Sequence, residues 1–378
     1  MATSQASSNE SEGPILSPKR SLWQRLFLTI KIRLFKALVT SVFKVWSLPG
    51  IRDNAIQPTY TKVYPCQPTL TNRIFIPKSY KSGDILPLYL SIHGGGFAIG
   101  SPMIDDPFSS SFSNDNKVIL VSLDYPKAPE CPYPGAVNAL IDTIKAVLED
   151  DALPYDKKKV AIGGFSAGAN LSLAVTQDEA LRSKIGGVTA YYPPVDFVTK
   201  GPQKMLTRPE GAPPDGLENM VAMFDYSYVP VGHDLKDPLL SVRFAQRENL
   251  PLKLCIVGCE FDMLCREAEI FAEKMGSVGS GKRTGSNVLW EQNGVRWEKI
   301  LGEEHGMSEN TAYKSLLFHG GLLTAEKDSM LEEITVERLK YELQKGRRRC
   351  MTVLPSGSFE RFMSDFSRRS LKHNEPPR

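Results

Sequence analysis

The stretch Gly164-Phe165-Ser166-Ala167-Gly168 lies between an apolar run at residues 160–163 and a helix-forming run at residues 169–177. A Gly-x-Ser-x-Gly string between a strand and a helix requires a tight, strained turn that lifts the serine oxygen away from the sheet. The two glycines leave room for the neighbouring strand and helix, where a side chain would collide. The stretch therefore predicts a nucleophilic serine, Ser166, at the end of a buried strand.

A second glycine-rich stretch, His93-Gly94-Gly95-Gly96-Phe97, follows another strand-like run at residues 86–92. Such a loop can point backbone N–H groups at the negative oxygen that develops when a carbonyl is attacked. The expected donors of this oxyanion hole are the backbone N–H groups of Gly95, Gly96 and Ala167. His93 and Gly94 are expected to support the loop, and the ring nitrogens of His93 would hold it in place.

Short β-rich runs alternate with helical runs through most of the chain after Pro58. The strands are expected at residues 61–66, 72–76, 86–92, 118–123, 160–163, 187–192, 252–257 and 295–301, and the helices at 135–148, 169–177, 263–275 and 308–319. A proline-marked turn between the first two strands favours an antiparallel pair. The remaining alternation predicts an α/β fold with a doubly wound, mostly parallel sheet and helices on both faces. Ligands bind such sheets beyond the carboxyl ends of the strands, where both glycine motifs fall.

A hydrolytic serine needs a general base, and in this kind of fold the chain order is serine, acid, histidine. The histidines that follow Ser166 are His233, His305, His319 and His373. His305 follows the last expected strand and precedes a helical run, so a loop there can bring its imidazole over the serine. His305 is therefore the predicted base.

The base in turn needs a carboxylate that orients its ring. Asp262 follows the expected strand at residues 252–257 and is the predicted acid, with Glu260 as the alternative two residues earlier. Glu303 and Glu304 are too close to His305 along the chain to lie behind its ring. The sequence thus predicts a triad of Ser166, Asp262 and His305.

The overall composition is that of a soluble globular protein, with 378 residues, 41% hydrophobic residues and 24% charged residues. The net charge of +3 is small for this length, so nucleic acid is not an expected partner. The six cysteines are scattered, and no histidine is interleaved with them at zinc-finger spacing. No metal site is predicted, and the cysteines are expected to be reduced thiols.

The N-terminal part of the chain divides into two segments. Residues 1–20 are rich in Ser, Asn and Glu, lack a secretory signal pattern and are expected to be disordered. Residues 21–57 include apolar residues at helical spacing from 22 to 46, with basic residues between them and no acid between Glu12 and Asp53. This pattern predicts an amphipathic helix whose uncharged stretches are too short to span a membrane. The helix is expected to be part of a cap over the active site, or to lie on an anionic membrane surface.

Other segments interrupt the alternation of strands and helices. Residues 195–249 are long and rich in Pro, Gly and aromatic residues, so we expect a cap insertion that divides the core into residues 58–194 and 250–345. Residues 276–286 contain several glycines and are expected to be a flexible surface insertion. Residues 346–378 are expected to be a basic C-terminal tail.

Taken together, these motifs resemble those of the hormone-sensitive-lipase-like carboxylesterases, a branch of the α/β-hydrolases. The resemblance extends over residues 60–319 and includes Asp124-Tyr125-Pro126-Lys127-Ala128-Pro129-Glu130 and Asp262-Met263-Leu264. It implies an α/β-hydrolase fold, a catalytic Ser-Asp-His triad, no cofactor, and a cap built from N-terminal helices and an insertion. It also implies that Glu130 lies near the nucleophile turn.

The chain departs from the family pattern at a few positions. Phe165 stands where the family usually carries Asp, Met307 stands where it usually carries an aromatic residue, and Pro126-Lys127 replaces Arg-Leu. None of these changes removes a reacting group. The changes at Phe165 and Met307 alter the walls of the site, so the family resemblance does not fix the substrate.

The predicted function is hydrolysis of short- or medium-chain acyl esters, including acetyl esters, of a moderately apolar small molecule. The candidate residues of an apolar pocket are Phe108, Phe197, Met220, Phe224 and Tyr228, which ordinary cap packing would explain equally well. The alternatives are an acyltransferase, an amidase or arylformamidase with the same triad, and a non-catalytic small-molecule receptor. The expected location is the cytoplasm, with contact to a membrane through residues 22–46 as the other option; no oligomeric state is predicted.

Overall fold

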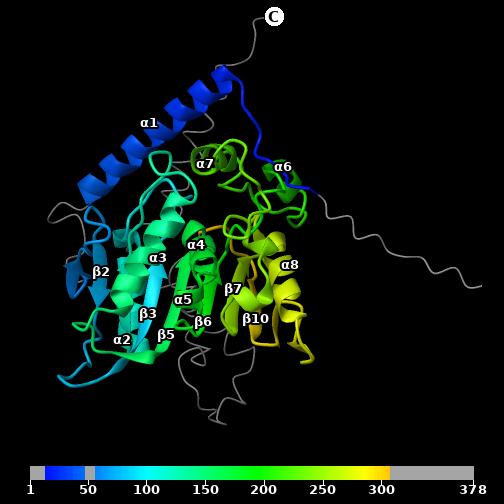
Figure 1. Cartoon of the computed structure of the whole chain (residues 1–378). Coiled ribbons are helices and arrows are strands. Elements are labelled where there is room, and N and C mark those ends of the chain that lie inside the picture. The colour runs from blue at the N-terminus through cyan, green and yellow to red at the C-terminus, as the bar shows by residue number, and fades with distance from the viewer. Residues whose placement is uncertain (1–12, 47–55, 307–378) are drawn as a thin grey trace, which may run out of the picture.

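The computed structural model of the protein describes residues 13–46 and 56–306 (Figure 1). The strands are β1 (Tyr60–Lys62), β2 (Asn72–Phe75), β3 (Leu86–Ile92), β4 (Ile119–Leu123), β5 (Tyr155–Phe165), β6 (Gly187–Tyr191), β7 (Lys253–Cys259), β8 (Thr284–Gly285), β9 (Leu289–Gln292) and β10 (Val295–Ile300). The α-helices are α1 (Leu22–Trp46), α2 (Asp106–Asn116), α3 (Gly135–Leu148), α4 (Ala167–Val175), α5 (Glu179–Arg182), α6 (Gly201–Met205), α7 (Val221–Tyr228) and α8 (Cys265–Gly276). Short 3₁₀ turns lie at η1 (Pro102–Asp105), η2 (Val242–Phe244) and η3 (Arg247–Asn249).

Within the described residues the strands form one sheet, in the order β1-β2-β4-β3-β5-β6-β7-β10-β9-β8. The central strands from β4 to β10 pair in parallel, whereas β1 and β2 at one edge and β9 and β8 at the other pair antiparallel. This confirms the predicted mostly parallel sheet and the antiparallel pair at its start. The expected helix at residues 308–319 and the expected tail lie outside the described residues.

The two faces of the sheet bury separate apolar cores. Along β3, Leu88 and Leu90 pack into a large core with residues of α3, α4 and α8, while Tyr89 between them belongs to a smaller core on the other face. Phe108 and Phe112 of α2 complete that smaller core. The alternation along β3 follows from the period of two in a strand, and burial on both faces explains its continuous apolar sequence.

The residues expected to form a cap lie together at one end of the molecule. Figure 1 shows α1 along the outside of this end, above α7 of the inserted segment. The two helices are in contact, with the rings of Phe35 and Phe224 at 6.4 Å and a 3.0 Å hydrogen bond between Thr29 and Tyr226. The inner face of α1 therefore packs against the insertion at residues 195–249.

Residues 13–20 differ from the expected disorder. Leu16 forms a β-bridge with Asp234, and the Ser17 N–H donates to the His233 carbonyl at 2.8 Å. The Leu235 N–H donates in turn to the carbonyl of Ile15 at 2.7 Å. Composition missed this segment because its order comes from backbone pairing with a distant part of the chain.

The segment at residues 276–286 also differs from the expected flexible insertion. It leads from α8 into a small antiparallel ribbon, in which Gly285 pairs with Trp290 of β9 and β9 pairs with β10. Asn293 and Gly294 turn the chain between β9 and β10 with φ angles of 47° and 78°. The buried Trp290 side chain fixes the ribbon against the rest of the protein.

Glu267 in the first turn of α8 fastens the start of the inserted segment to the core. Its Oε1 accepts hydrogen bonds from the N–H groups of Val195 at 2.8 Å and Asp196 at 3.2 Å, and its Oε2 lies 2.6 Å from the Lys204 ammonium. Burial raises the pKa of Glu267 to about 7, although the charge of Lys204 acts in the opposite direction. The folded protein thus holds a proton on Glu267 more tightly than the unfolded chain does.

This raised pKa predicts that stability depends on pH. Between pH 4.5, the ordinary pKa of the group, and about 7, the folded state binds more protons than the unfolded state, so the free energy of unfolding falls as pH rises. Glu267→Gln cannot titrate and should flatten this slope by up to about 1 kcal/mol per pH unit. Urea unfolding at a series of pH values measures the slope.

Glu149→Gln serves as the matched control, because Glu149 is an exposed carboxylate at the end of α3. Its slope should equal that of the wild type. An unchanged slope in Glu267→Gln would show that the buried carboxylate is not the group responsible.

Candidate active site

Ser166 lies in a strained turn between β5 and α4. Its φ and ψ angles are 51° and −116°, a conformation that a non-glycine residue rarely adopts. A Cβ atom on Gly168 would lie 2.0 Å from the Ile92 carbonyl oxygen, and one on Gly164 would lie 2.4 Å from the same atom. The end of β3 therefore presses directly against the turn, and glycine is required on both sides of Ser166.

The structure brings Ser166, His305 and Asp262 into one hydrogen-bonded chain. The Ser166 hydroxyl lies 2.9 Å from Nε2 of His305, and the Nδ1–H of His305 donates to Asp262 Oδ2 at 2.7 Å. Asp262 is almost fully buried, with 1% of its surface exposed, whereas Ser166 is half-buried. The carboxylate fixes the tautomer in which Nε2 can accept the serine proton.

The rival residues take other partners. His233 lies in the inserted segment, and its Nε2 is 2.9 Å from the carboxylate of Asp237. Glu260 accepts the N–H of Gly302 at 2.7 Å and so supports the loop that leads to His305. His319 and His373 lie outside the described residues.

The expected oxyanion loop lies beside the nucleophile. A Cβ atom on Gly94 would lie 3.6 Å from the Ser166 Cβ. Gly95 and Gly96 have φ angles of 113° and 56°, so the loop depends on glycine at both positions. Within residues 13–46 and 56–306, the N–H groups of Gly95, Gly96 and Ala167 donate to no acceptor. They are available for a bound oxygen.

His93 lies under this loop and holds its backbone. Its Nδ1–H donates to the Gly94 carbonyl at 2.6 Å, its Nε2 lies 3.4 Å from Asp124, and its ring stacks on Tyr125 at 4.5 Å. Burial and the charge of Lys127 lower the pKa of His93, although the hydrogen bonds to Asp124 and Gly94 act in the opposite direction. Burial acts to raise the pKa of Asp124, but hydrogen bonds and charge from His93 and Lys127 bring it down to about 2.

Glu130 does not lie where the family resemblance implied. Its side chain is exposed and pairs with Lys36 of α1 at the surface, rather than lying near the nucleophile turn. Lys36 also donates to the Ala128 carbonyl at 2.8 Å. The replacement of Arg-Leu by Pro126-Lys127 accompanies this change, and Glu130 here joins α1 to the core.

Two residues of the inserted segment hold the loop that carries Asp262, and no sequence motif predicts them. The Arg208 Nε donates to the Phe261 carbonyl at 2.8 Å, and the N–H of Met263 donates to Asp215 Oδ2 at 2.8 Å. The backbone groups on both sides of Asp262 are thus held from the cap. Burial and the charge of Asp262 raise the pKa of Asp215, while the charge of His305 lowers it.

Of the aromatic residues predicted to line a pocket, Phe197, Phe224 and Tyr228 lie near the glycine loop, whereas Phe108 does not. A Cβ atom on Gly96 would lie 2.6 Å from the ring of Phe224, so α7 rests directly on the oxyanion loop. Phe97 stacks on Tyr228 at 3.9 Å, and Phe197 lies 6.0 Å from Phe97. The ring of Phe108 instead packs against the ring of Phe165 on the opposite face of the sheet, with the ring centres 4.9 Å apart. Phe108 is therefore a core residue and does not line a substrate pocket.

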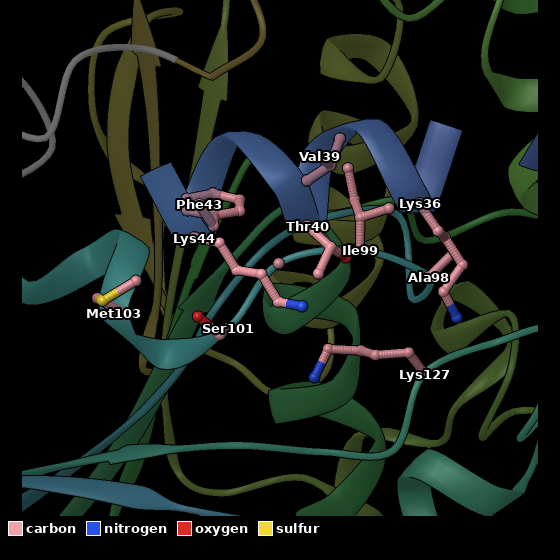
Figure 2. Close-up of a pocket in the computed structure, with 11 residues that line it drawn as sticks. Lys36, Val39, Thr40, Phe43, Lys44, Ala98, Ile99, Ser101, Met103 and Lys127 are labelled. Atoms are coloured by element: carbon pink, nitrogen blue, oxygen red, sulfur yellow. The ribbon is translucent and has the colours of Figure 1, made fainter. Parts of the chain in front are cut away.

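A pocket of about 260 Å³ separates α1 from the chain that follows the oxyanion loop (Figure 2). Its walls include Val39 and Phe43 of α1 and Ile99 beyond the loop, and the side chains of Lys44 and Lys127 extend into it. A Cβ atom on Gly100, also in the wall, would lie 3.3 Å from the His93 ring. Helix α1 thus covers the back of the oxyanion loop.

No group of three or more potential metal ligands occurs within the described part of the chain. Cys255, Cys259 and Cys265 are buried thiols. Across the same residues, no helix combines the length and the apolarity that a bilayer crossing needs.

Comparison with known proteins gives consistent matches. Residues 89–287 match a family model described as alpha/beta hydrolase fold. An AB hydrolase superfamily protein of Schizosaccharomyces pombe is 25% identical over 224 residues, which are 55% of this chain and 63% of that protein. An esterase of Acinetobacter venetianus is 26% identical over 255 residues, 63% of this chain and 80% of the esterase.

The chain therefore spans a little under two thirds of the yeast relative. Among solved structures, an esterase from Pyrobaculum calidifontis superimposes with a TM-score of 0.60 at 22% identity, covering 79% of this chain and 97% of that one. This likeness supports the fold. The family match covers more than half of the chain, and the chain belongs to the hormone-sensitive-lipase-like carboxylesterase family of the α/β-hydrolase fold.

Proposed function

We propose that the protein is a serine carboxylesterase that hydrolyses short- or medium-chain acyl esters of a moderately apolar small molecule. The observation that carries the proposal is the hydrogen-bonded chain from Ser166 through His305 to Asp262, at distances of 2.9 and 2.7 Å. The N–H groups of Gly95 and Gly96, in the loop that follows Gly94, and of Ala167, next to Ser166, would serve as the oxyanion donors. Nucleophile, base, orienting acid and oxyanion donors are the set that acyl transfer requires.

In the first half of the reaction, Ser166 Oγ attacks the ester carbonyl carbon while His305 Nε2 takes the hydroxyl proton. The carbonyl electron pair moves to the oxygen, and the three N–H groups hold the negative charge, each contributing about 2.7–4 kcal/mol. The bond to the leaving alcohol oxygen then breaks. The imidazolium of His305 returns its proton to that oxygen, which leaves an acyl group on Ser166.

In the second half, water attacks the acyl carbon and His305 takes a proton from it. Collapse of the second tetrahedral intermediate breaks the bond to Ser166 Oγ, which recovers its proton from His305. The carboxylic acid leaves, and the starting enzyme is restored. Asp262 stabilises the imidazolium in both halves without being protonated itself.

The apolar character of the substrate is supported by the residues over the site. Phe224 lies against the oxyanion loop, and Phe97, Phe197 and Tyr228 form an aromatic group beside it. Relatives with esterase names include an arylesterase of Saccharolobus solfataricus, 32% identical over 195 residues. An ester with an apolar acyl or alcohol part would be stabilised by such a surface.

The first prediction from this proposal concerns Ser166. With p-nitrophenyl esters from acetate to decanoate, the wild type should give a burst of p-nitrophenol followed by steady turnover, because the acyl-enzyme accumulates. Ser166→Ala should lose the burst and at least about 10³-fold of kcat/KM. Rapid-mixing absorbance measures both, and the chain length with the highest kcat/KM indicates the size of the acyl pocket.

Ser172→Ala is the matched control, because Ser172 lies in α4 and its hydroxyl donates only to the Gly168 carbonyl at 2.8 Å. It should keep the burst. Adding short alcohols tests acyl transfer: ester formation faster than hydrolysis would favour the acyltransferase. A folded wild type without turnover on any ester would contradict the proposal and favour the receptor.

The second prediction concerns Asp215, which we propose to be a positioning residue for Asp262. Asp215→Asn removes a negative charge that interacts with His305. The imidazolium becomes less stable, so the acidic limb of the kcat/KM pH profile should move to lower pH. Asp215→Ala also removes the acceptor of the Met263 N–H and should lower kcat about tenfold with little change in KM.

Asp237→Asn is the control for this pair, since Asp237 is another carboxylate of the cap insertion with a histidine neighbour, His233. Its pH profile should equal that of the wild type. A profile in Asp215→Asn that also overlays the wild type would show that Asp215 has no electrostatic effect on the base.

A further inference from the structure

Helix α1 has two apolar faces. Leu28, Ile32, Phe35 and Val39 are buried at helical spacing and form the inner face. On the opposite side, Trp23, Phe27 and Leu34 are 81%, 66% and 61% exposed, with Leu26 and Ile30 between them. We call these five residues the outer face of α1. Residues three or four positions apart share one face of a helix. Each set therefore forms its own stripe, and the two stripes lie on opposite sides of α1.

The inner face and its polar neighbours account for the attachment of α1. Phe35 packs near Phe224, Thr29 bonds to Tyr226, and Lys31 donates to the Asn219 carbonyl at 3.0 Å. Lys36 adds its bonds to Ala128 and Glu130. The outer face is not needed for any of these contacts. Figure 1 shows α1 as an outermost element at its end of the molecule.

The exposed side of α1 is basic as well as apolar. Arg25, Arg33 and Lys44 are exposed on α1. Arg33 is three residues from Ile30 and borders the outer face, while Arg25 and Lys44 lie nearer the two ends of the helix, and the sequence contains no acid between Glu12 and Asp53. An aromatic and aliphatic face bordered by cations is the pattern of helices that lie in the interface of an anionic bilayer. Basic residues near such a surface are attracted by its negative potential, and tryptophan is favoured at the headgroup level.

Other occupants fit this charge pattern less well. A second copy of the chain, docked through the same face, would bring the cations of two helices together with no acid of α1 to compensate. A bilayer crossing is not an option for α1, since no helix in the described residues is long and apolar enough. Contiguous exposed apolar side chains still require a partner, because leaving them in water is unfavourable.

We propose that the outer face of α1 docks the protein onto the surface of anionic lipid bilayers. The helix lies parallel to the surface, with Trp23, Phe27 and Leu34 in the interface and the exposed cations of α1, Arg33 foremost, at the lipid phosphates. This docking goes beyond the proposed ester hydrolysis and does not depend on it. Failure of one therefore leaves the other standing, because vesicle binding is measured without any substrate.

The test is co-flotation of the full chain with vesicles of phosphatidylcholine alone and of phosphatidylcholine mixed with phosphatidylserine. The wild type should float with the mixed vesicles, and binding should weaken as salt is raised, because the cations contribute. A variant carrying W23Q, F27Q and L34Q should bind about tenfold or more weakly. A second variant carrying R25E and R33E should lose the preference for phosphatidylserine.

The matched control carries Ile85→Gln and Leu252→Gln. These two residues are also exposed apolar residues, at 64% and 82%, but they precede β3 and β7 at the opposite edge of the sheet from the active site. The control should bind vesicles as the wild type does. None of the changed side chains is buried, so all variants should keep the fold. Thermal unfolding of each variant checks this.

Tryptophan fluorescence gives an independent measurement. Lipids with a quencher on the acyl chain should reduce the emission of the wild type, and Trp23→Phe should remove the quenched fraction. The proposal is overturned if the triple variant binds as well as the wild type, or if vesicles leave Trp23 emission unchanged. Concentration-dependent dimers lost in the triple variant, without vesicle binding, would instead identify a second copy as the occupant.

Discussion

The strained conformation of Ser166 is the constraint on which the rest of the site depends. Its φ of 51° is held by the N–H bond to the Tyr191 carbonyl at 2.9 Å and by the Ile92 carbonyl, which leaves no space for a side chain at positions 164 and 168. The cost of such a conformation is of order 1–3 kcal/mol, and it persists only where surrounding structure fixes it. Here the surrounding structure is the parallel sheet, because β3, β5 and β6 end at the same edge. Ser166, the glycine loop after β3 and the Asp262 loop after β7 therefore converge without any special sequence between them.

The inserted segment stabilises this arrangement as well as covering it. Arg208 and Asp215 bind the backbone on either side of Asp262, and Phe224 rests on Gly96. Glu267 joins the beginning of the insertion to α8. An insertion bound in this way couples its own position to Asp262 and to the glycine loop at residues 94–96. Movement of the cap would therefore change the geometry of the reacting groups as well as access to them.

The sequence predicted those parts of the structure that depend on local patterns. The positions of most strands along the chain, the strained serine turn and the glycine loop follow from short motifs and apolar periodicity. Arg208 and Asp215 could not be predicted, because their partners are backbone groups 53 and 48 residues away along the chain. Helix α2 was missed because its buried Phe108 and Phe112 are separated by serines. The ribbon of β9 and β10 had a usable signal, the Asn293-Gly294 pair between alternating residues, which is typical of a hairpin turn.

The two roles considered for residues 22–46, cap helix and membrane-surface helix, are compatible because they use different faces. An amphipathic helix with a single apolar face can bury that face against its own protein or in a lipid surface, but not in both. Helix α1 buries Leu28, Ile32, Phe35 and Val39 against the protein and still exposes a second apolar face that contains Trp23 and Phe27. Val39 of the inner face also lines the pocket behind the glycine loop, together with Phe43. Docking through the outer face would then turn the end of the molecule that carries the inserted segment toward the lipid surface, with α1 between that surface and α7.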